Sequence, residues 1–447
     1  MNIKPILIKN GRLIDPTQNL DSNKDILIEN GLISKIGNNL IHSTAHKINA
    51  KGLIVSPGFI DLHCHLRDPG YESSETIKTG TAAAAAGGYT TICAMPNTNP
   101  PMDSKIAIKY VQEESKKNGY VNVLTIGAIT KNRDGKELTP MVELAELGVV
   151  GFSDDGNPVY DANIMRQALN YSTITNTPII NHCEVLELSK GGLINEGPIS
   201  TRLGVKGIPW AAESIMAYRD IQLSKLTGGK LHIAHVSTKA TLDIIKDAKE
   251  SGINVTCEVT PHHITLTENI LLGKDKSGSE FTSLNLNSYD TNAKVKPPLR
   301  NITDVEAMIN GIKNGVIDFI ATDHAPHKFL SKNTTLENAE FGISNIETAL
   351  SSALSLFHNS QISLDLIIEK LSSSPAKFLN TSDIGNLKKG SKADITIFDP
   401  NKIWTVNYNE FYSKGKNTPI NGYKMKGKVI FTIVSGKIKF ENSKIYD

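Results

Sequence analysis

The segment Asp61-Leu62-His63-Cys64-His65-Leu66-Arg67 carries the residues best suited to chemistry in this chain. If residues 60–65 form a β-strand, its two-residue repeat places His63 and His65 on one face, with Asp61 beside them. Two imidazoles placed in this way can hold one metal ion. An isolated His-x-His pair is about as often structural as metal-binding, so the rest of the chain must decide between these two interpretations.

The composition is that of an ordinary globular protein. The chain has 447 residues, of which 39% are hydrophobic and 21% are charged. This length is sufficient for one large domain and a smaller one. The net charge of +2 arises from 48 basic and 46 acidic residues that are spread along the sequence. This balance argues against nucleic acid or a membrane surface as a partner, and favours small molecules or protein subunits.

The four cysteines, Cys64, Cys93, Cys183 and Cys257, are too few and too scattered to form a disulfide framework. The N-terminal residues lack the pattern of a signal peptide, and no apolar run approaches the length that spans a membrane. We therefore expect a cytoplasmic protein.

Both ends of the chain contain short runs of β-branched residues separated by turn signals. Such runs predict strands within residues 3–54 and again within residues 394–440. Neither end alone has enough strands for a stable sheet. We therefore predict one small composite β-sandwich from residues 1–55 plus 385–447.

The middle of the chain alternates strand and helix patterns over residues 56–384. Eight strands are predicted at residues 60–65, 90–95, 123–126, 149–153, 178–182, 231–236, 254–260 and 318–322. Helices are predicted at residues 73–86, 141–147, 163–170, 211–226, 240–250 and 304–314. This α/β alternation favours a (β/α)8 TIM-like barrel over a doubly wound open sheet. The run Ala82 to Ala86 indicates a closely packed helix, and Lys274–Asn292 is expected to form a mobile loop.

Polar residues occur where the predicted strands end, and in a barrel these ends meet at one mouth. They are His63, His65, Asn97, Asp154, Asp155, His182, His235, Asp323 and His327. Four histidines and two carboxylates make a nitrogen and oxygen site that suits zinc, manganese or cobalt. Six ligands exceed the number that one tetrahedral zinc uses, so two metals sharing a carboxylate are expected.

Other histidines and cysteines are left out of this ligand set. Cys64 and Cys183 adjoin ligands but should point away from them, because successive strand residues alternate faces. His232 and the pair His262-His263 are about as often structural as functional in such positions.

Several motifs resemble those of dihydroorotases, and the similarity extends from about Gly11 to Gly436. They are Asp-x-His-x-His-x-Arg at 61–67, Gly-Gly-Tyr-Thr-Thr at 87–91, Met-Pro-Asn-Thr at 95–98, Pro-His-His at 261–263, Pro-Pro-Leu-Arg at 297–300, Ala-Thr-Asp-His-Ala-Pro-His at 321–327 and Gly-Ser-Lys-Ala-Asp at 390–394. The resemblance implies the amidohydrolase superfamily, with a barrel, an accessory β-sandwich and a mononuclear or binuclear metal site.

The same resemblance implies a role for each metal ligand. His63 and His65 would bind the first Zn²⁺ and His182 and His235 the second, giving two per chain. Asp155 would bridge them, as in the bacterial dihydroorotases that use aspartate in place of a carboxylated lysine. The choice of Asp155 over the adjacent Asp154 rests on alignment to that branch.

The implied reaction is the reversible cyclisation of N-carbamoyl-L-aspartate to dihydroorotate in pyrimidine synthesis. Asp323, also a metal ligand, would take the proton of the attacking water and pass it to the leaving nitrogen. The implied substrate-binding residues are His65, Arg67, Asn97, Lys296, His327, Phe341 and Gly342. Arg67 discriminates best, because dihydroorotate has a carboxylate that dihydropyrimidines lack. Lys296 stands where the family often has a substrate-contacting asparagine.

Two other functions stay open at this point. One is a different cyclic amidohydrolase, such as a dihydropyrimidinase, hydantoinase or allantoinase. The other is a non-catalytic scaffold that binds aspartate transcarbamoylase, although retention of all six ligands argues against it. We expect a homodimer, and a complex with aspartate transcarbamoylase remains open.

Overall fold

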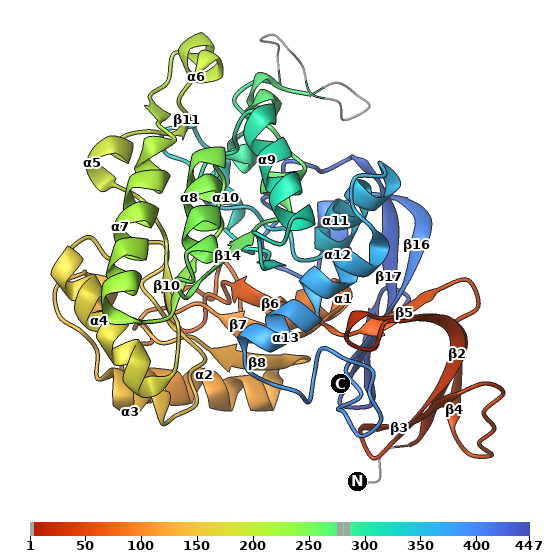
Figure 1. Ribbon diagram of the computed structural model, residues 1–447. Coiled ribbons are helices and arrows are strands. Elements are labelled where there is room, and N and C mark those ends of the chain that lie inside the picture. The colour runs from red at the N-terminus through yellow and green to blue at the C-terminus, as the bar shows by residue number, and fades with distance from the viewer. Residues whose placement is uncertain (1–3, 275–279, 281–286) are drawn as a thin grey trace.

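The computed structural model describes residues 4–274, 280 and 287–447. A region of helices and parallel strands adjoins a long, mostly antiparallel sheet, which forms one side of the molecule (Figure 1). The expected mobile loop at 274–292 falls largely on residues 275–279 and 281–286, which lie outside the described residues.

All eight strands predicted for the middle of the chain are present, and they pair in parallel. One sheet contains β6 (Phe59–Cys64), β7 (Tyr89–Ala94) and β8 (Asn122–Thr125). A second contains β9 (Phe152–Ser153), β10 (Ile179–Asn181), β13 (Leu231–Ile233), β14 (Val255–Val259) and β15 (Phe319–Ile320). Isolated parallel bridges join Gly127 to Phe152 and Cys64 to His324. The two sheets are therefore connected at both of their edges, and the carboxyl ends of their strands face the same way.

Helix α1 (Ile77–Ala86) shows why an alanine run occurs next to the first strand. The Thr76 side chain accepts a hydrogen bond from the Thr79 N–H at its start, and Gly87 ends it. Ala83, Ala84 and Ala85 are fully buried. Their small side chains let the helix backbone lie close to the strands, which confirms the predicted close packing.

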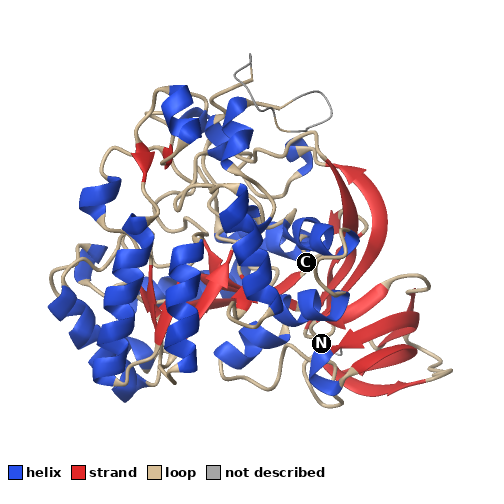
Figure 2. Cartoon of the chain, turned by 45° about the horizontal axis from the view of Figure 1, so that its top comes forward, coloured by secondary structure: helices blue, strands red, loops and turns tan. Residues whose placement is uncertain are grey.

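Most helices lie outside the parallel strands (Figure 2). They are α2 (Lys105–Asn118), α3 (Met141–Ala145), α4 (Ala162–Thr175), α7 (Ala211–Thr227), α8 (Lys239–Glu250), α9 (Ile302–Lys313), α11 (Ala349–His358), α12 (Leu364–Leu371) and α13 (Ser373–Phe378). The connecting segments contain α5 (Leu186–Ser189), β11 (Ile194–Asn195), α6 (Pro198–Leu203), β12 (Gly207–Ile208) and α10 (Phe329–Lys332). Sequence patterns did not predict α2, α11, α12 or α13. Within the described residues, no helix has both the length and the hydropathy needed to cross a membrane.

Strands from both chain ends join in one nine-stranded sheet. It contains β1 (Ile6–Asp15), β2 (Leu20–Glu29), β3 (Leu32–Gly37), β4 (His46–Asn49), β5 (Ile54–Pro57), β16 (Ile395–Thr405), β17 (Lys424–Val434), β18 (Lys437–Glu441) and β19 (Lys444–Ile445). Strand β5 makes the connection, because Val55 lies opposite Leu13 of β1 and opposite Ile397 of β16. One face of this sheet builds a second hydrophobic core, whereas other residues of the sheet, such as Ile14, Phe398 and Val429, pack into the core of the parallel strands.

The packing of α1 gives a stability prediction. Ala84→Leu should lower the free energy of unfolding by about 1–3 kcal/mol, because added methylenes in a filled core force neighbours to move. Urea denaturation measures this difference. Lys78→Leu, at an exposed position of the same helix, is the control and should change stability little. Equal effects of the two substitutions would contradict the close packing of α1.

Candidate metal centre and active site

Histidines from three strand ends surround one aspartate. His63 is the penultimate residue of β6 and His65 directly follows that strand, while His182 and His235 follow β10 and β13. Asp155 follows β9 and belongs to two clusters whose possible ligand atoms lie within 4.8 Å of one another, one with His63 and His65 and one with His182 and His235. All five side chains are buried. The structure therefore brings together five of the residues that are predicted from the sequence and the family resemblance to bind metal.

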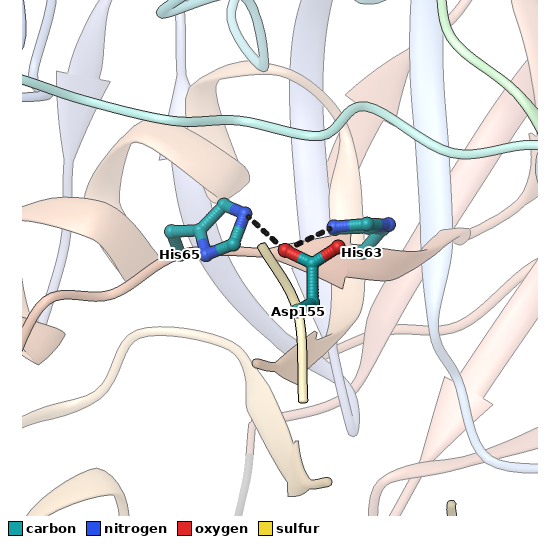
Figure 3. Close-up of side chains that lie close together, drawn as sticks. All are labelled: His63, His65 and Asp155. Atoms are coloured by element: carbon teal, nitrogen blue, oxygen red, sulfur yellow. Dashed lines mark ion pairs between the residues drawn. The ribbon is translucent and has the colours of Figure 1, made fainter. Parts of the chain in front are cut away.

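The two oxygens of Asp155 face different histidine pairs. Oδ2 lies 3.4 Å from His63 Nε2 and 3.5 Å from His65 Nε2 (Figure 3). Oδ1 lies 3.5 Å from His182 Nδ1 and 3.4 Å from His235 Nε2. A carboxylate placed in this way can donate one oxygen to each of two metal ions.

These separations fit metal coordination. Two ligand atoms about 2.0–2.1 Å from a tetrahedral zinc lie about 3.4 Å apart, which matches the distances around Asp155. Within the described chain, His63 Nε2 and Asp155 Oδ1 are buried and have no hydrogen-bond partner. Because buried polar atoms are normally satisfied, these two atoms favour a bound cation. The nitrogen and oxygen donors suit zinc and exclude a thiolate site.

The geometry distinguishes Asp154 from Asp155. Asp154 Oδ1 accepts hydrogen bonds from the backbone N–H groups of Ile129 (2.9 Å) and Thr130 (3.0 Å), and its Oδ2 accepts one from the Thr130 hydroxyl (2.5 Å). Asp154 therefore anchors the loop after β8. Arg133 Nη1 donates to the backbone carbonyl of Asp155 at 2.6 Å and helps to hold that residue towards the histidines.

Asp323 also reaches the histidines. Its Oδ1 lies 3.1 Å from His65 Nε2 and 3.5 Å from His63 Nε2. Burial raises the pKa of Asp323, but the charge of His63 and the hydrogen bond with His65 more than offset this and hold the pKa well below its usual range. Asp323 is therefore an ionised carboxylate beside the cluster.

Asn97 and His327 lie around the cluster but already have protein partners. Asn97 Oδ1 lies 2.8 Å from His65 Nδ1, so the amide orients that imidazole. His327 Nε2 donates to the Phe341 carbonyl at 2.8 Å. Burial and the charge of Arg67 lower the pKa of His327 to about 3, so its ring is neutral. The Asn97 amide therefore contacts His65, and the His327 ring is held against the Phe341 carbonyl.

Arg67 and the Phe341-Gly342 peptide are held in defined positions. Arg67 adopts a left-handed backbone conformation (φ 62°), and its Nε donates to the Pro326 carbonyl at 3.2 Å. The Gly342 N–H donates to the Lys294 carbonyl at 3.0 Å. A Cβ atom at Gly342 would lie 2.9 Å from His327 Nε2, and the φ of 144° also favours glycine.

Lys296 makes a contact that the sequence did not indicate. Its Nζ lies 2.8 Å from Glu184 Oε1, and Glu184 Oε2 lies 3.3 Å from His182 Nε2. The lysine is therefore paired with the carboxylate that orients a predicted metal ligand. The position of Glu184, two residues after His182, was an available signal for this carboxylate.

The residues left out of the predicted ligand set lie in structural environments. His263 contacts the Thr260 hydroxyl and the Pro297 carbonyl, and His262 Nδ1 accepts from Asn345 Nδ2 at 3.0 Å. Cys64 and Cys183 belong to the hydrophobic core that the strands share with the helices. The two thiols therefore face away from the histidines, as predicted.

Comparison with solved structures defines the class of fold. L-Hydantoinase (dihydropyrimidinase) from Arthrobacter aurescens matches with a TM-score of 0.86 and 23% identity, covering 100% of this chain and 98% of that one. Dihydropyrimidinase from Brevibacillus agri matches with a TM-score of 0.82 and 24% identity, covering 99% and 96%. The protein therefore has the mixed α/β fold of the amidohydrolases.

Sequence comparison defines the family within that class. A model described as "Dihydro-orotase-like" matches residues 52–241. Dihydroorotase from Caldanaerobacter subterraneus subsp. tengcongensis is 46% identical over 99% of both chains, and that from Aquifex aeolicus is 47% identical over 98% of this chain and 99% of its own. The chain belongs to the dihydroorotase family and is a cyclic amide hydrolase. Amidohydrolases of this kind depend on metal.

A segment near the C-terminus completes the site. Asn417 accepts a hydrogen bond from the His327 N–H at 2.9 Å and donates to the Gly342 carbonyl at 3.0 Å. Glu347 holds the preceding turn by accepting from the backbone N–H groups of Tyr412 (3.2 Å) and Ser413 (3.1 Å). Burial nevertheless raises the pKa of Glu347 from 4.5 to about 8.

This raised pKa predicts a pH-dependent stability. Folding favours the protonated Glu347, so the parent should lose stability as the pH rises from about 4.5 to about 8. Glu347→Gln lacks this titration, so its stability relative to the parent should rise by about 1–3 kcal/mol between pH 5 and pH 8.5. Urea denaturation at both pH values measures the change, with exposed Glu337→Gln as the control. A constant difference between Glu347→Gln and the parent would show that Glu347 does not titrate in this range.

Proposed function

We propose that this protein catalyses the reversible cyclisation of N-carbamoyl-L-aspartate to (S)-dihydroorotate and water, the dihydroorotase reaction of pyrimidine synthesis. The observation that carries this proposal is the shared Asp155 carboxylate between two histidine pairs, in a chain 44–47% identical to proteins named dihydroorotase. The hydantoinase-like structures are less than 25% identical and support only the fold.

We propose two Zn²⁺ ions per chain as the cofactor. His63, His65 and Asp155 would hold one ion, with Asp323 beside it, and Asp155, His182 and His235 would hold the other. When bound, the ions would polarise the amide carbonyl and lower the pKa of a water molecule. The distances around Asp155 and the two unsatisfied buried atoms support this assignment.

Asp323 moves the proton in this mechanism. Because it is held ionised, it begins hydrolysis as the acceptor of a proton from the attacking water. It then delivers this proton to the ring nitrogen as the amide bond breaks. In the direction of synthesis, Asp323 takes the proton from the attacking carbamoyl nitrogen. Closing the ring also consumes a proton, so higher pH favours hydrolysis.

Arg67 confers specificity in this proposal. A guanidinium can form two parallel hydrogen bonds with a carboxylate, and dihydroorotate carries a carboxylate that dihydropyrimidines lack. Asn97, His65 and His327 would lie around the same substrate, with Phe341-Gly342 as a wall. Lys296 stays in the proposed substrate-binding set because it is 28% exposed and lies 5.1 Å from the centre of the Phe341 ring.

We further propose a division of the chain into a (β/α)8 TIM-like barrel, residues 56–384, and a composite β-sandwich, residues 1–55 plus 385–447. The bridges that connect both edges of the parallel sheets support the barrel. The separate core of the nine-stranded sheet supports the second domain.

The proposed cellular setting is a cytoplasmic homodimer. Four unpaired, buried cysteines support a reducing compartment. Exposed large hydrophobic side chains at Trp210, Ile215 and Tyr218, on and just before α7, support a subunit contact. A complex with aspartate transcarbamoylase belongs to the same proposal and rests on the family resemblance.

The direct test is hydrolysis of dihydroorotate by purified, zinc-loaded protein, followed by loss of substrate absorbance. Asp323→Asn should lower kcat by about 10²–10⁴-fold, because the proton carrier is lost. Asp365→Asn, which alters an exposed carboxylate on α12, should leave kcat unchanged. Absence of parent activity would overturn the proposal, and unchanged kcat in Asp323→Asn would remove Asp323 from its role.

The same assay separates the related functions. Dihydrouracil, hydantoin and allantoin lack the carboxylate assigned to Arg67, so they should be turned over far more slowly than dihydroorotate. Faster turnover of any of them would replace the proposed substrate with that cyclic amide.

A further inference from the structure

Glu258 is a buried carboxylate that the proposed mechanism does not use. It lies on β14, is 1% exposed, and is flanked in sequence by the hydrophobic residues Cys257 and Val259. Its Oε1 lies 2.6 Å from His63 Nδ1, and its Oε2 lies 3.3 Å from His232 Nε2. Burying an ionised carboxylate in a strand costs free energy unless the charge is paired, so the two histidine contacts of Glu258 need an explanation.

The contact with Glu258 fixes the tautomer of His63. An ionised carboxylate only accepts hydrogen bonds, so His63 Nδ1 must carry the hydrogen that it donates. The lone pair of His63 is then on Nε2, the atom that lies 3.4 Å from Asp155 Oδ2. A carboxylate behind a metal-binding imidazole orients the ring and increases its basicity.

His232 holds the other oxygen of Glu258. His232 Nε2 lies 3.3 Å from Glu258 Oε2, and the Thr256 hydroxyl lies 2.8 Å from His232 Nδ1. The His232 ring stacks on Phe319, with centroids 5.1 Å apart and an interplanar angle of 11°. The side chains of Thr256, His232, Glu258 and His63 therefore form one row of polar contacts that ends at the histidine cluster.

The two halves of the cluster differ in the charge of the side chains that stand behind their histidines. Behind His182 stands Glu184, whose other oxygen is paired with the ammonium of Lys296. Behind His65 stands the neutral amide of Asn97. The carboxylate behind His63 contacts two imidazoles and keeps its negative charge close to the cluster. A cation beside His63 and His65 should feel this charge more strongly than one beside His182 and His235.

We propose that Glu258 is a positioning residue, supported by His232, that makes the His63/His65 half of the cluster the tighter of the two metal sites. This inference rests on the proposed two-metal function. It adds an order of loading, in which the first Zn²⁺ occupies the His63/His65 half and the second occupies the His182/His235 half.

Zinc titration of the metal-free full-length protein, in competition with a chelator, tests this order. The parent should bind two ions with different affinities. Glu258→Gln keeps the shape of the side chain but removes its charge, so it should weaken the tighter ion by about 10–100-fold and leave the weaker ion unchanged. Glu184→Gln should instead weaken the second ion. Glu268→Gln, at a buried carboxylate that contacts Asn195, is the matched control and should change neither.

A milder variant covers the case in which Glu258→Gln does not fold. Thr256→Val removes only the hydroxyl at the outer end of the row and should weaken the tighter ion by a smaller factor. The ¹⁵N NMR shifts of the His63 ring give a second readout, with the hydrogen on Nδ1 in the parent and a shift towards Nε2 in Glu258→Gln.

Three outcomes overturn the inference. They are parent-like binding of both ions by the Glu258 and Thr256 variants, equal weakening of both ions, and loss of the weaker ion alone. Two tight ions and full dihydroorotate hydrolysis in these variants would reject the inference and leave the proposed function intact. A parent protein that binds no zinc and hydrolyses no dihydroorotate would reject both.

Discussion

The sharing of one carboxylate between two histidine pairs is the constraint on which the rest of the structure depends. Asp155 can face both pairs only if the ends of β6, β10 and β13 meet around this residue, which lies two positions after the end of β9. Parallel strands joined at both sheet edges satisfy this requirement, because all their carboxyl ends then point into the same space. The helices and the nine-stranded sheet serve this arrangement by burying the outer faces of those strands.

Burying this cluster costs free energy, and that cost explains why polar side chains surround it. Four imidazoles and two carboxylates are removed from water, and each needs partners to remain stable there. A polar side chain stands behind three of the imidazoles: Asn97 behind His65, Glu184 behind His182 and Glu258 behind His63. Each of them contacts the ring nitrogen that does not face Asp155. These contacts select the ring nitrogen that faces the shared carboxylate, so the cluster is ordered by its surroundings before a cation arrives.

Much of this could be predicted from the sequence, because the relevant signals are local. Runs of β-branched residues located all eight parallel strands, and polar residues at the ends of those runs located His63, His182 and the Asp154-Asp155 pair. The choice of Asp155 within that pair came from the family resemblance. Helix α2 was not predicted, since its charged sequence buries only a few side chains such as Ile108 and Val111. Helices α11 to α13 follow β15, the last of the parallel strands, and therefore fall outside the strand–helix repeat on which the prediction relied.

The supporting residues were not predictable, because they depend on contacts between distant segments. Asn417 reaches His327 across 90 residues, and Glu258 reaches His63 across 195. The sequence suggests Lys296 only as a possible substrate contact, because its pairing with Glu184 depends on two loops that meet at the site. Residue type and spacing identify which side chains can bind a cation, whereas only the fold identifies what orients them.

Anomalous diffraction at the zinc edge, from crystals grown with zinc, tests the central claim most directly. Two peaks should lie on either side of Asp155, each about 2.0–2.2 Å from one of its carboxylate oxygens, and roughly 3.5–4 Å from each other. One peak should adjoin His63 and His65, and the other His182 and His235. A single peak, or coordination through Asp154 in place of Asp155, would contradict the account.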